Sequence, residues 1–167
     1  ADHPMEGEAA SALASAAIRY YLLKFNLESQ IVFDFDEALK TTGDTGVYLE
    51  YAYARACSIL RKAEERKIDL QWRKDSIPTR LTETERDLLE ALERFQSVVS
   101  NVGRNLRVSQ LTEYAFDLAT CFTNFYEHPD PGEEVQTPFI HLEDRDLQGF
   151  RLSMVKAFRT VMANLLR

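Results

Sequence analysis

Apolar residues recur at every third or fourth position in five stretches of the chain, the spacing that places them on one face of an α-helix. The stretches run from Glu8 to Phe25, from Val47 to Lys67, from Thr82 to Val102, from Val108 to Glu127 and from Glu143 to Leu166. Each has a single apolar stripe. Helices of this kind bury their stripes by packing together, so the sequence predicts an all-α fold, a helix bundle of about five helices.

The stripes identify the candidate core. They are Leu13, Ala17, Tyr20 and Leu23 in the first helix, Leu49, Ala52, Tyr53, Ala56, Ile59, Leu60 and Ala63 in the second, Leu88, Leu92, Phe95, Val99 and Val102 in the third, Leu111, Ala115, Leu118, Phe122 and Phe125 in the fourth, and Leu147, Phe150, Met154, Phe158, Val161 and Leu165 in the fifth. The small residues of the second stripe predict close packing of another helix there.

Signals at the helix ends define the connections between them. Thr82 and Glu85 fit a capping box, in which the hydroxyl accepts from the third amide and the carboxylate reaches back. Residues 31–36 alternate apolar and acidic, so we expect an extended or irregular connection before the second helix. Gly103 and Asn105 are expected to end the third helix.

The composition suits one globular domain. The chain has 167 residues, of which 45% are apolar and 28% charged, and no apolar run approaches the roughly 18 residues that a membrane span needs. Cys57 and Cys121 each lie within a predicted helix, which favours reduced, buried thiols over a disulfide or a zinc site. We therefore expect no membrane association and a cytoplasmic protein.

The charge is unevenly distributed. The net charge of −7 counts against a simple nucleic-acid-binding protein, which is usually basic. Residues 55–80, however, hold eight bases and four acids, while residues 127–146 hold seven acids and one base. Residues 151–167 hold four bases and no acids. Electrostatic fields in salt solution decay over about 8 Å. The sign of the charge on each face of the protein therefore matters more for binding than the net charge of the chain.

One face of the second helix is a candidate site for nucleic acid. Tyr48, Tyr51, Arg55, Ser58 and Lys62 share a sector beside the apolar stripe, aromatic at one end and basic along the rest. Unpaired bases stack on such rings while Arg and Lys meet phosphates. The alternative is that the tyrosines form the edge of the core, with buried rings and hydrated hydroxyls. The helical spacing alone is compatible with both.

The last helix repeats this pattern more weakly. Arg151, Lys156 and Arg159 lie away from its apolar stripe, so they are either weaker RNA-binding candidates or a solvated basic face. Glycine-rich phosphate loops, GxSxG, EF-hand spacing and Glu-x-x-His pairs are all missing from the sequence. We therefore expect no catalytic residue and no metal site in this chain.

Two blocks of sequence resemble a known family. Residues 42–55, TGDTGVYLEYAYAR, closely resemble the segment that opens the anticodon-binding domain of arginyl-tRNA synthetases, whose pattern is close to N-T-[GA]-P-Y-[LI]-Q-Y-A-[HY]-[ATS]-R. The departures are Asp44, Val47 and Glu50. Residues 111–127 are similar to the family's helix that ends in F-x-x-F-Y. Residues 17–20 and 33–39 look like the run that leads out of the catalytic domain.

The resemblance implies the DALR-type anticodon-binding domain of a class I aminoacyl-tRNA synthetase. On this interpretation residues 1–40 are the helix and connection out of a catalytic domain, and residues 41–167 are the anticodon-binding bundle. The family's tyrosines at the positions of Tyr48 and Tyr51 face the anticodon loop, and the one at Tyr126 lies near it.

The resemblance also implies a function. We expect recognition of arginine tRNA without chemistry, with Tyr48 and Tyr51 stacking on bases and Arg55, Lys62 and the last helix meeting phosphates. The full enzyme joins arginine to its tRNA with ATP and magnesium, but the HIGH-type and KMSKS-type motifs are missing here. This chain alone should therefore be inactive, with the catalytic domain as a partner. The alternative is a stand-alone DALR-like module that binds protein through its acidic loop.

Overall fold

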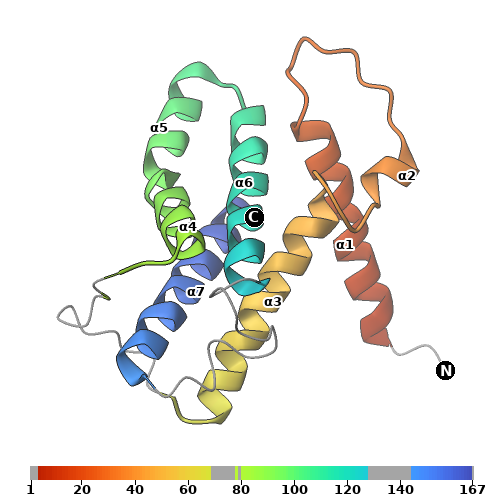
Figure 1. Ribbon diagram of the computed structural model, residues 1–167. Helices are drawn as coiled ribbons and strands as arrows, with labels where there is room; N and C mark the ends of the chain where they lie inside the picture. The colour runs from red at the N-terminus through yellow and green to blue at the C-terminus, as the bar shows by residue number, and fades with distance from the viewer. Residues whose placement is uncertain (1–3, 69–77, 79, 128–143, 167) are drawn as a thin grey trace.

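The computed structural model describes residues 4–68, 78, 80–127 and 144–166, and this part of the chain contains helices and no strand (Figure 1). The helices are α1 (Pro4–Leu23), α2 (Phe35–Ala38), α3 (Gly46–Glu65), α4 (Glu83–Glu93), α5 (Phe95–Asn105), α6 (Ser109–Glu127) and α7 (Arg145–Leu165). The predicted all-α bundle is confirmed.

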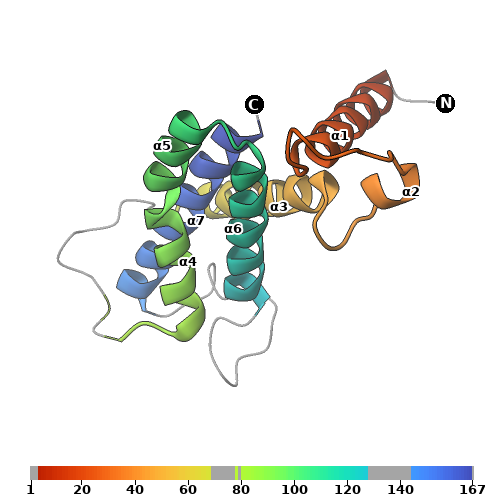
Figure 2. The same cartoon turned by 90° about the horizontal axis from the view of Figure 1, so that it is seen from above.

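Helices α3, α4, α6 and α7 form the body of the bundle, and α1 lies to one side against α3 and α6 (Figure 2). The core lies where α3, α6 and α7 meet. Phe122 of α6 and Phe158 of α7 stack there, with ring centroids 3.9 Å apart and 6° between the ring planes. Both rings are buried, as are most of the apolar positions predicted for α3, α6 and α7.

The third predicted helix is two helices, α4 and α5, separated at Arg94. The Tyr114 hydroxyl of α6 donates to the carbonyl of Ala91 at 2.9 Å. In a continuous helix that carbonyl would accept from the amide of Phe95, so an inserted side chain explains the break. Gly103 does not end the helix as predicted. The helix continues to Asn105, and Leu106 follows in the left-handed conformation with a φ of 58°.

Two smaller predictions near the N-terminus are also corrected. Leu13 and Leu23 of α1 were expected in the core but are 41% and 46% exposed, because α1 contacts the bundle along only part of its surface. The connection after α1 contains the one-turn helix α2. Asp34 begins α2 by accepting a hydrogen bond from the Glu37 amide at 3.1 Å.

The predicted capping box at α4 is confirmed, and it carries a buried ion pair. Glu85 accepts from the Thr82 amide at 2.9 Å, and the Thr82 hydroxyl accepts from the Glu85 amide at 3.2 Å. The other Glu85 oxygen lies 2.7 Å from Nε of Arg151 on α7, and both side chains are 1% exposed. This pair joins the first turn of α4 to the second turn of α7.

Two further sequence predictions concern the cysteines and the metal-ligand side chains. Cys57 and Cys121 are both free and only partly buried, whereas the sequence favoured buried thiols. Among the described residues we find no cluster of metal-ligand side chains and no helix long and apolar enough to cross a membrane. The three histidines and most of the acidic segment 127–146 lie outside the described residues.

Candidate nucleic-acid interface

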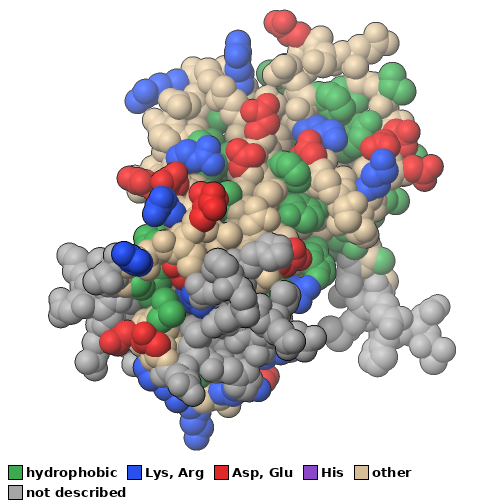
Figure 3. All heavy atoms as spheres, in the orientation of Figure 1, with side chains coloured by type: hydrophobic (Ala, Val, Ile, Leu, Met, Phe, Trp, Pro, Cys, Tyr) green, Lys and Arg blue, Asp and Glu red, His purple; other side chains and the backbone are tan. Residues whose placement is uncertain are grey.

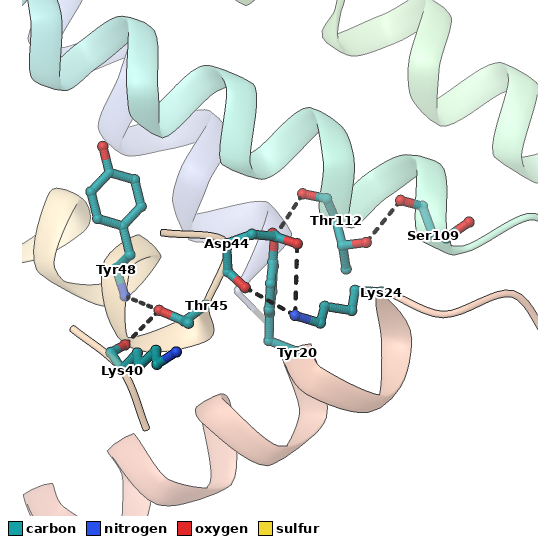
Figure 4. Close-up of polar contacts among 8 residues, drawn as sticks. All are labelled: Tyr20, Lys24, Lys40, Asp44, Thr45, Tyr48, Ser109 and Thr112. Atoms are coloured by element: carbon teal, nitrogen blue, oxygen red, sulfur yellow. Dashed lines mark hydrogen bonds and ion pairs between the residues drawn. The ribbon is translucent and has the colours of Figure 1, made fainter. Parts of the chain in front are cut away.

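The direction of α3 is set by the residues that precede it (Figure 4). Gly43 turns the chain with a φ of 81°, a conformation that favours glycine. The Thr45 hydroxyl caps α3 by accepting from the Tyr48 amide at 3.3 Å, and it donates to the Lys40 carbonyl at 2.7 Å. The first turn of α3 is therefore anchored to the loop that leads into it.

The buried side of α3 matches the stripe expected from the sequence. Its buried members are Leu49, Ala52, Ala56, Ile59, Leu60 and Ala63. The alanines let α6 and α7 approach closely, and in the neighbouring sector of α3 Tyr51 and Lys62 are exposed while Tyr48, Arg55 and Ser58 are partly buried. That sector carries the candidate RNA-binding residues.

Tyr51, Arg55 and Tyr126 form one cluster across α3 and α6. The Arg55 guanidinium carbon lies 5.0 Å from the centroid of the Tyr51 ring and 4.7 Å from that of Tyr126. Nη1 of Arg55 donates to the Tyr126 hydroxyl at 3.0 Å, and Nη2 contacts the Tyr51 hydroxyl. The structure therefore brings together three residues that the sequence singled out, although Tyr126 is 71 positions from Arg55.

The cluster combines charge with aromatic surface. Partial burial by itself lowers the pKa of the Arg55 guanidinium, but Tyr126 and Tyr51 together raise that pKa, so the group stays charged. The side chain of Tyr51 is 54% exposed, and Tyr126 is partly exposed. A cation held between two rings can present its edge to a phosphate while the exposed ring accepts a base.

Tyr48 lies apart from this cluster. Its hydroxyl donates to Oγ1 of Thr123 at 3.0 Å, and its ring centroid is 5.7 Å from that of Phe116, both on α6. Tyr48 thus lies in the contact between α3 and α6, which is the core-edge arrangement considered as the alternative for the tyrosines. Helical spacing did not identify Thr123 as its partner, because the pairing joins positions 75 residues apart.

The basic candidates divide into exposed and buried ones. Lys62 is exposed, seven residues beyond Arg55 and so on the same face of α3. On α7, Lys156 is exposed and Arg159 is partly exposed. The prediction that Arg151 lies on this solvated basic face is wrong, because Arg151 is buried against Glu85. A charge away from the apolar stripe can face a neighbouring helix as well as water.

Comparisons with known proteins identify the family of this chain. The family model for the DALR anticodon binding domain matches residues 49–167. The arginine–tRNA ligase of Pyrococcus furiosus is 36% identical over 160 residues, which cover 94% of this chain and 24% of that protein. The arginine–tRNA ligase of Clostridium perfringens is 38% identical over 162 residues, covering 95% of this chain and 26% of that protein.

The fold is also similar to solved structures. The arginyl-tRNA synthetase of Thermus thermophilus superposes with a TM-score of 0.82 and 34% identity, covering 99% of this chain and 27% of that one. The Plasmodium falciparum arginyl-tRNA synthetase gives a TM-score of 0.76 and 28% identity, covering 95% and 26%. The chain thus spans about a quarter of the length of the relatives it matches. From the family model and the shared helical bundle together, this chain belongs to the DALR anticodon-binding domain family.

Proposed function

We propose that this chain recognises the anticodon region of an arginine tRNA as part of an arginine–tRNA ligase. The observation that carries the proposal is the Tyr51, Arg55 and Tyr126 cluster on the surface of a DALR domain. The matched relatives, named as arginine–tRNA ligases, supply the kind of tRNA. Joining arginine to tRNA with ATP and magnesium belongs to a catalytic part whose nucleotide motifs this sequence does not contain.

Recognition then rests on stacking and charge. An anticodon loop presents splayed, unpaired bases. The exposed ring of Tyr51 stacks on one base, which contributes about 1–3 kcal/mol to binding. Arg55, held between the rings of Tyr51 and Tyr126, contacts a phosphate. Lys62 extends the charge along the same face of α3 and meets the phosphate backbone. The net acidity of the chain is no obstacle, because screening confines each interaction to its own face.

Replacing Tyr51 by alanine should weaken binding to the arginine anticodon stem-loop by about 1–3 kcal/mol. Its exposed side chain contributes little to the core, so the thermal midpoint should barely change. Tyr48→Ala is the matched comparison, since it removes a ring and a hydrogen bond between α3 and α6 and should lower the midpoint first. Both quantities are measured on the same purified variants. Unchanged affinity of Tyr51→Ala would mean that this face is not the RNA site.

Lys62→Ala should act differently from Tyr51→Ala. A phosphate contact carries no base information, so the loss of affinity should be similar for arginine tRNA and for an unrelated tRNA. The slope of log affinity against log salt should also become shallower by about one phosphate contact. Filter binding of both tRNAs over a salt series measures this. A loss confined to arginine tRNA would show that Lys62 reads sequence.

The catalytic part of such an enzyme must dock on this domain. The surface formed by α1, α2 and the segment between them is apolar and is a candidate for that docking site. Figure 3 shows apolar side chains gathered at the upper right of the molecule, where α1 and α2 lie. Of the eleven large apolar residues that are exposed in the described part, eight belong to α1, α2 and the segment between and just after them: Leu13, Ile18, Leu22, Leu23, Leu27, Val32, Phe35 and Leu39. From residue 9 to residue 23 the only charged side chain is Arg19. A helix that is apolar around most of its circumference is usually covered on more than one side.

The occupant we propose for this face is the catalytic part of an arginyl-tRNA synthetase. The relatives match 94% of this chain, including this face, and about three quarters of each relative lies outside the match. Ile18→Glu with Leu22→Glu should abolish co-elution with the unmatched three quarters of the Thermus thermophilus enzyme and leave stem-loop affinity unchanged. Val99→Glu, at an exposed apolar site on α5, is the control. Co-elution that persists in the double variant, or is missing for the unaltered chain, would refute this.

The alternative function, a module that binds protein through its acidic loop, depends on residues 127–146. Most of that segment lies outside the described residues. None of the described contacts favours this alternative over RNA recognition.

A further inference from the structure

The hydroxyl of Tyr20 joins three parts of the fold at one point (Figure 4). Tyr20 lies on α1 and is 7% exposed. Its hydroxyl contacts the carboxylate of Asp44, two residues before α3, and lies 3.1 Å from the carbonyl oxygen of Thr112 in the first turn of α6. One hydroxyl proton is thus within reach of two acceptors from segments 24 and 92 positions away.

The surroundings of Tyr20 hold this arrangement in place. Nζ of Lys24 lies 3.8 Å from the second carboxylate oxygen of Asp44 and donates to the Asp44 carbonyl at 3.3 Å. Burial, followed by the hydrogen bond to Asp44, raises the pKa of Tyr20 well above its usual value. The phenol therefore keeps its proton and remains a hydrogen-bond donor at neutral pH.

Helix α3 also begins in direct contact with α1. A Cβ atom on Gly46, the first residue of α3, would lie 2.8 Å from the Ala16 carbonyl oxygen and 2.9 Å from Cβ of Tyr20. The backbone of α3 can approach α1 this closely only at a glycine. The start of α6 is tied to the same region, because the Ser109 hydroxyl lies 3.1 Å from Oδ1 of Asn26, just after α1. One end of α1 thus fixes the starts of both α3 and α6.

These two helices carry the candidate RNA-binding cluster. Tyr51 and Arg55 lie on α3, and Tyr126 lies on α6. Arg55 is nine residues beyond Gly46, about 13.5 Å along α3, so a tilt of about 5° at the start of α3 moves Arg55 by about 1.2 Å. A shift of this size would break the 3.0 Å hydrogen bond between Arg55 and Tyr126.

We propose that Tyr20 is a positioning residue for RNA recognition, whose hydroxyl holds α3 and α6 in the relative position that brings Tyr51, Arg55 and Tyr126 together. The inference rests on the proposed function and adds to it. It makes α1, which lies outside the family-model match at residues 49–167, part of the RNA-binding unit. Tyr20 itself touches no RNA.

The test variant is Tyr20→Phe, which keeps the buried ring and removes only the hydroxyl. The control is Tyr21→Phe, the next residue of α1, whose hydroxyl donates to the Val32 carbonyl at 3.1 Å and reaches neither α3 nor α6. When the competent arrangement becomes a minor fraction, apparent affinity falls by that fraction. We expect Tyr20→Phe to bind the arginine anticodon stem-loop about three- to tenfold more weakly at a temperature where every variant is folded, and Tyr21→Phe to match the unaltered chain.

Combining variants separates positioning from general destabilisation. In a Tyr51→Ala background the effect of Tyr20→Phe should nearly disappear, since the cluster that Tyr20 positions is already lost. In a Lys62→Ala background it should persist in full. Unchanged affinity of Tyr20→Phe with a lower thermal midpoint, or the same fold-loss in all backgrounds, would overturn the proposal.

A measurement without RNA keeps this test independent of the proposed function. The side-chain protons of Arg55 lie over two aromatic rings, so ring currents displace their nuclear magnetic resonance signals. These displacements should shrink in Tyr20→Phe and persist in Tyr21→Phe. If the unaltered chain does not prefer the arginine stem-loop, the proposed function fails, and the Arg55 signals still decide the positioning role. Unchanged Arg55 signals in Tyr20→Phe would overturn it.

Discussion

Replacing Arg151 by methionine should lower the free energy of unfolding by about 3–5 kcal/mol, because breaking a buried ion pair leaves a charge without compensation. Arg151 and Glu85 are each 1% exposed, and Nε of Arg151 lies 2.7 Å from Oε1 of Glu85. Methionine fills much of the same volume, so the loss comes from the Glu85 carboxylate, which keeps its buried place at the start of α4 without its cation. Chemical denaturation of the purified chain measures the change.

Two further variants show whether the ion pair is the cause. Lys156→Met changes an exposed base on the same helix and should shift the free energy of unfolding by no more than about 0.5 kcal/mol. Adding Glu85→Gln to Arg151→Met should recover much of the lost stability, because the amide oxygen can still accept from the Thr82 amide and the buried charge is gone. An Arg151→Met variant as stable as Lys156→Met would contradict the buried pair.

Phe158→Ala should lower the free energy of unfolding by about 3–5 kcal/mol, the usual cost of emptying a buried aromatic site. Phe158 is fully buried and stacks on Phe122. The ring lies where α6 and α7 meet, so its removal leaves a cavity that both helices would have to move to fill. Leu118→Ala, also fully buried on α6, should cost about 2–5 kcal/mol.

An exposed apolar position supplies the comparison for these core variants. Val99 of α5 belongs to a predicted apolar stripe but is 45% exposed, so Val99→Ala should change the unfolding midpoint in denaturant only slightly. Midpoints for Phe158→Ala and Leu118→Ala that agree with the unaltered chain would mean that these two positions do not form the core.

The sequence by itself determined most of the helices and most of their inner faces. Helical periodicity is a local property, because residues three and four positions apart share a face whatever the rest of the fold does. For the same reason Tyr51 and Arg55, four residues apart on α3, had to be neighbours. The capping box at Thr82 needed only side chains three positions apart. The two blocks at residues 42–55 and 111–127 were sufficient to indicate the family.

Only the tertiary structure decided which residues contact the helix surfaces outside the apolar stripes. Tyr126 joined Tyr51 and Arg55 because α6 lies beside α3, whereas the ring of Tyr48 turned toward α6. Helical spacing predicted that Arg151 is a surface base, but in the folded protein Glu85 of α4 lies against it and both side chains are buried. A polar side chain outside an apolar stripe has no local preference between water and a partner on another helix. That choice depends on contacts between residues far apart in the sequence, which helical spacing does not encode.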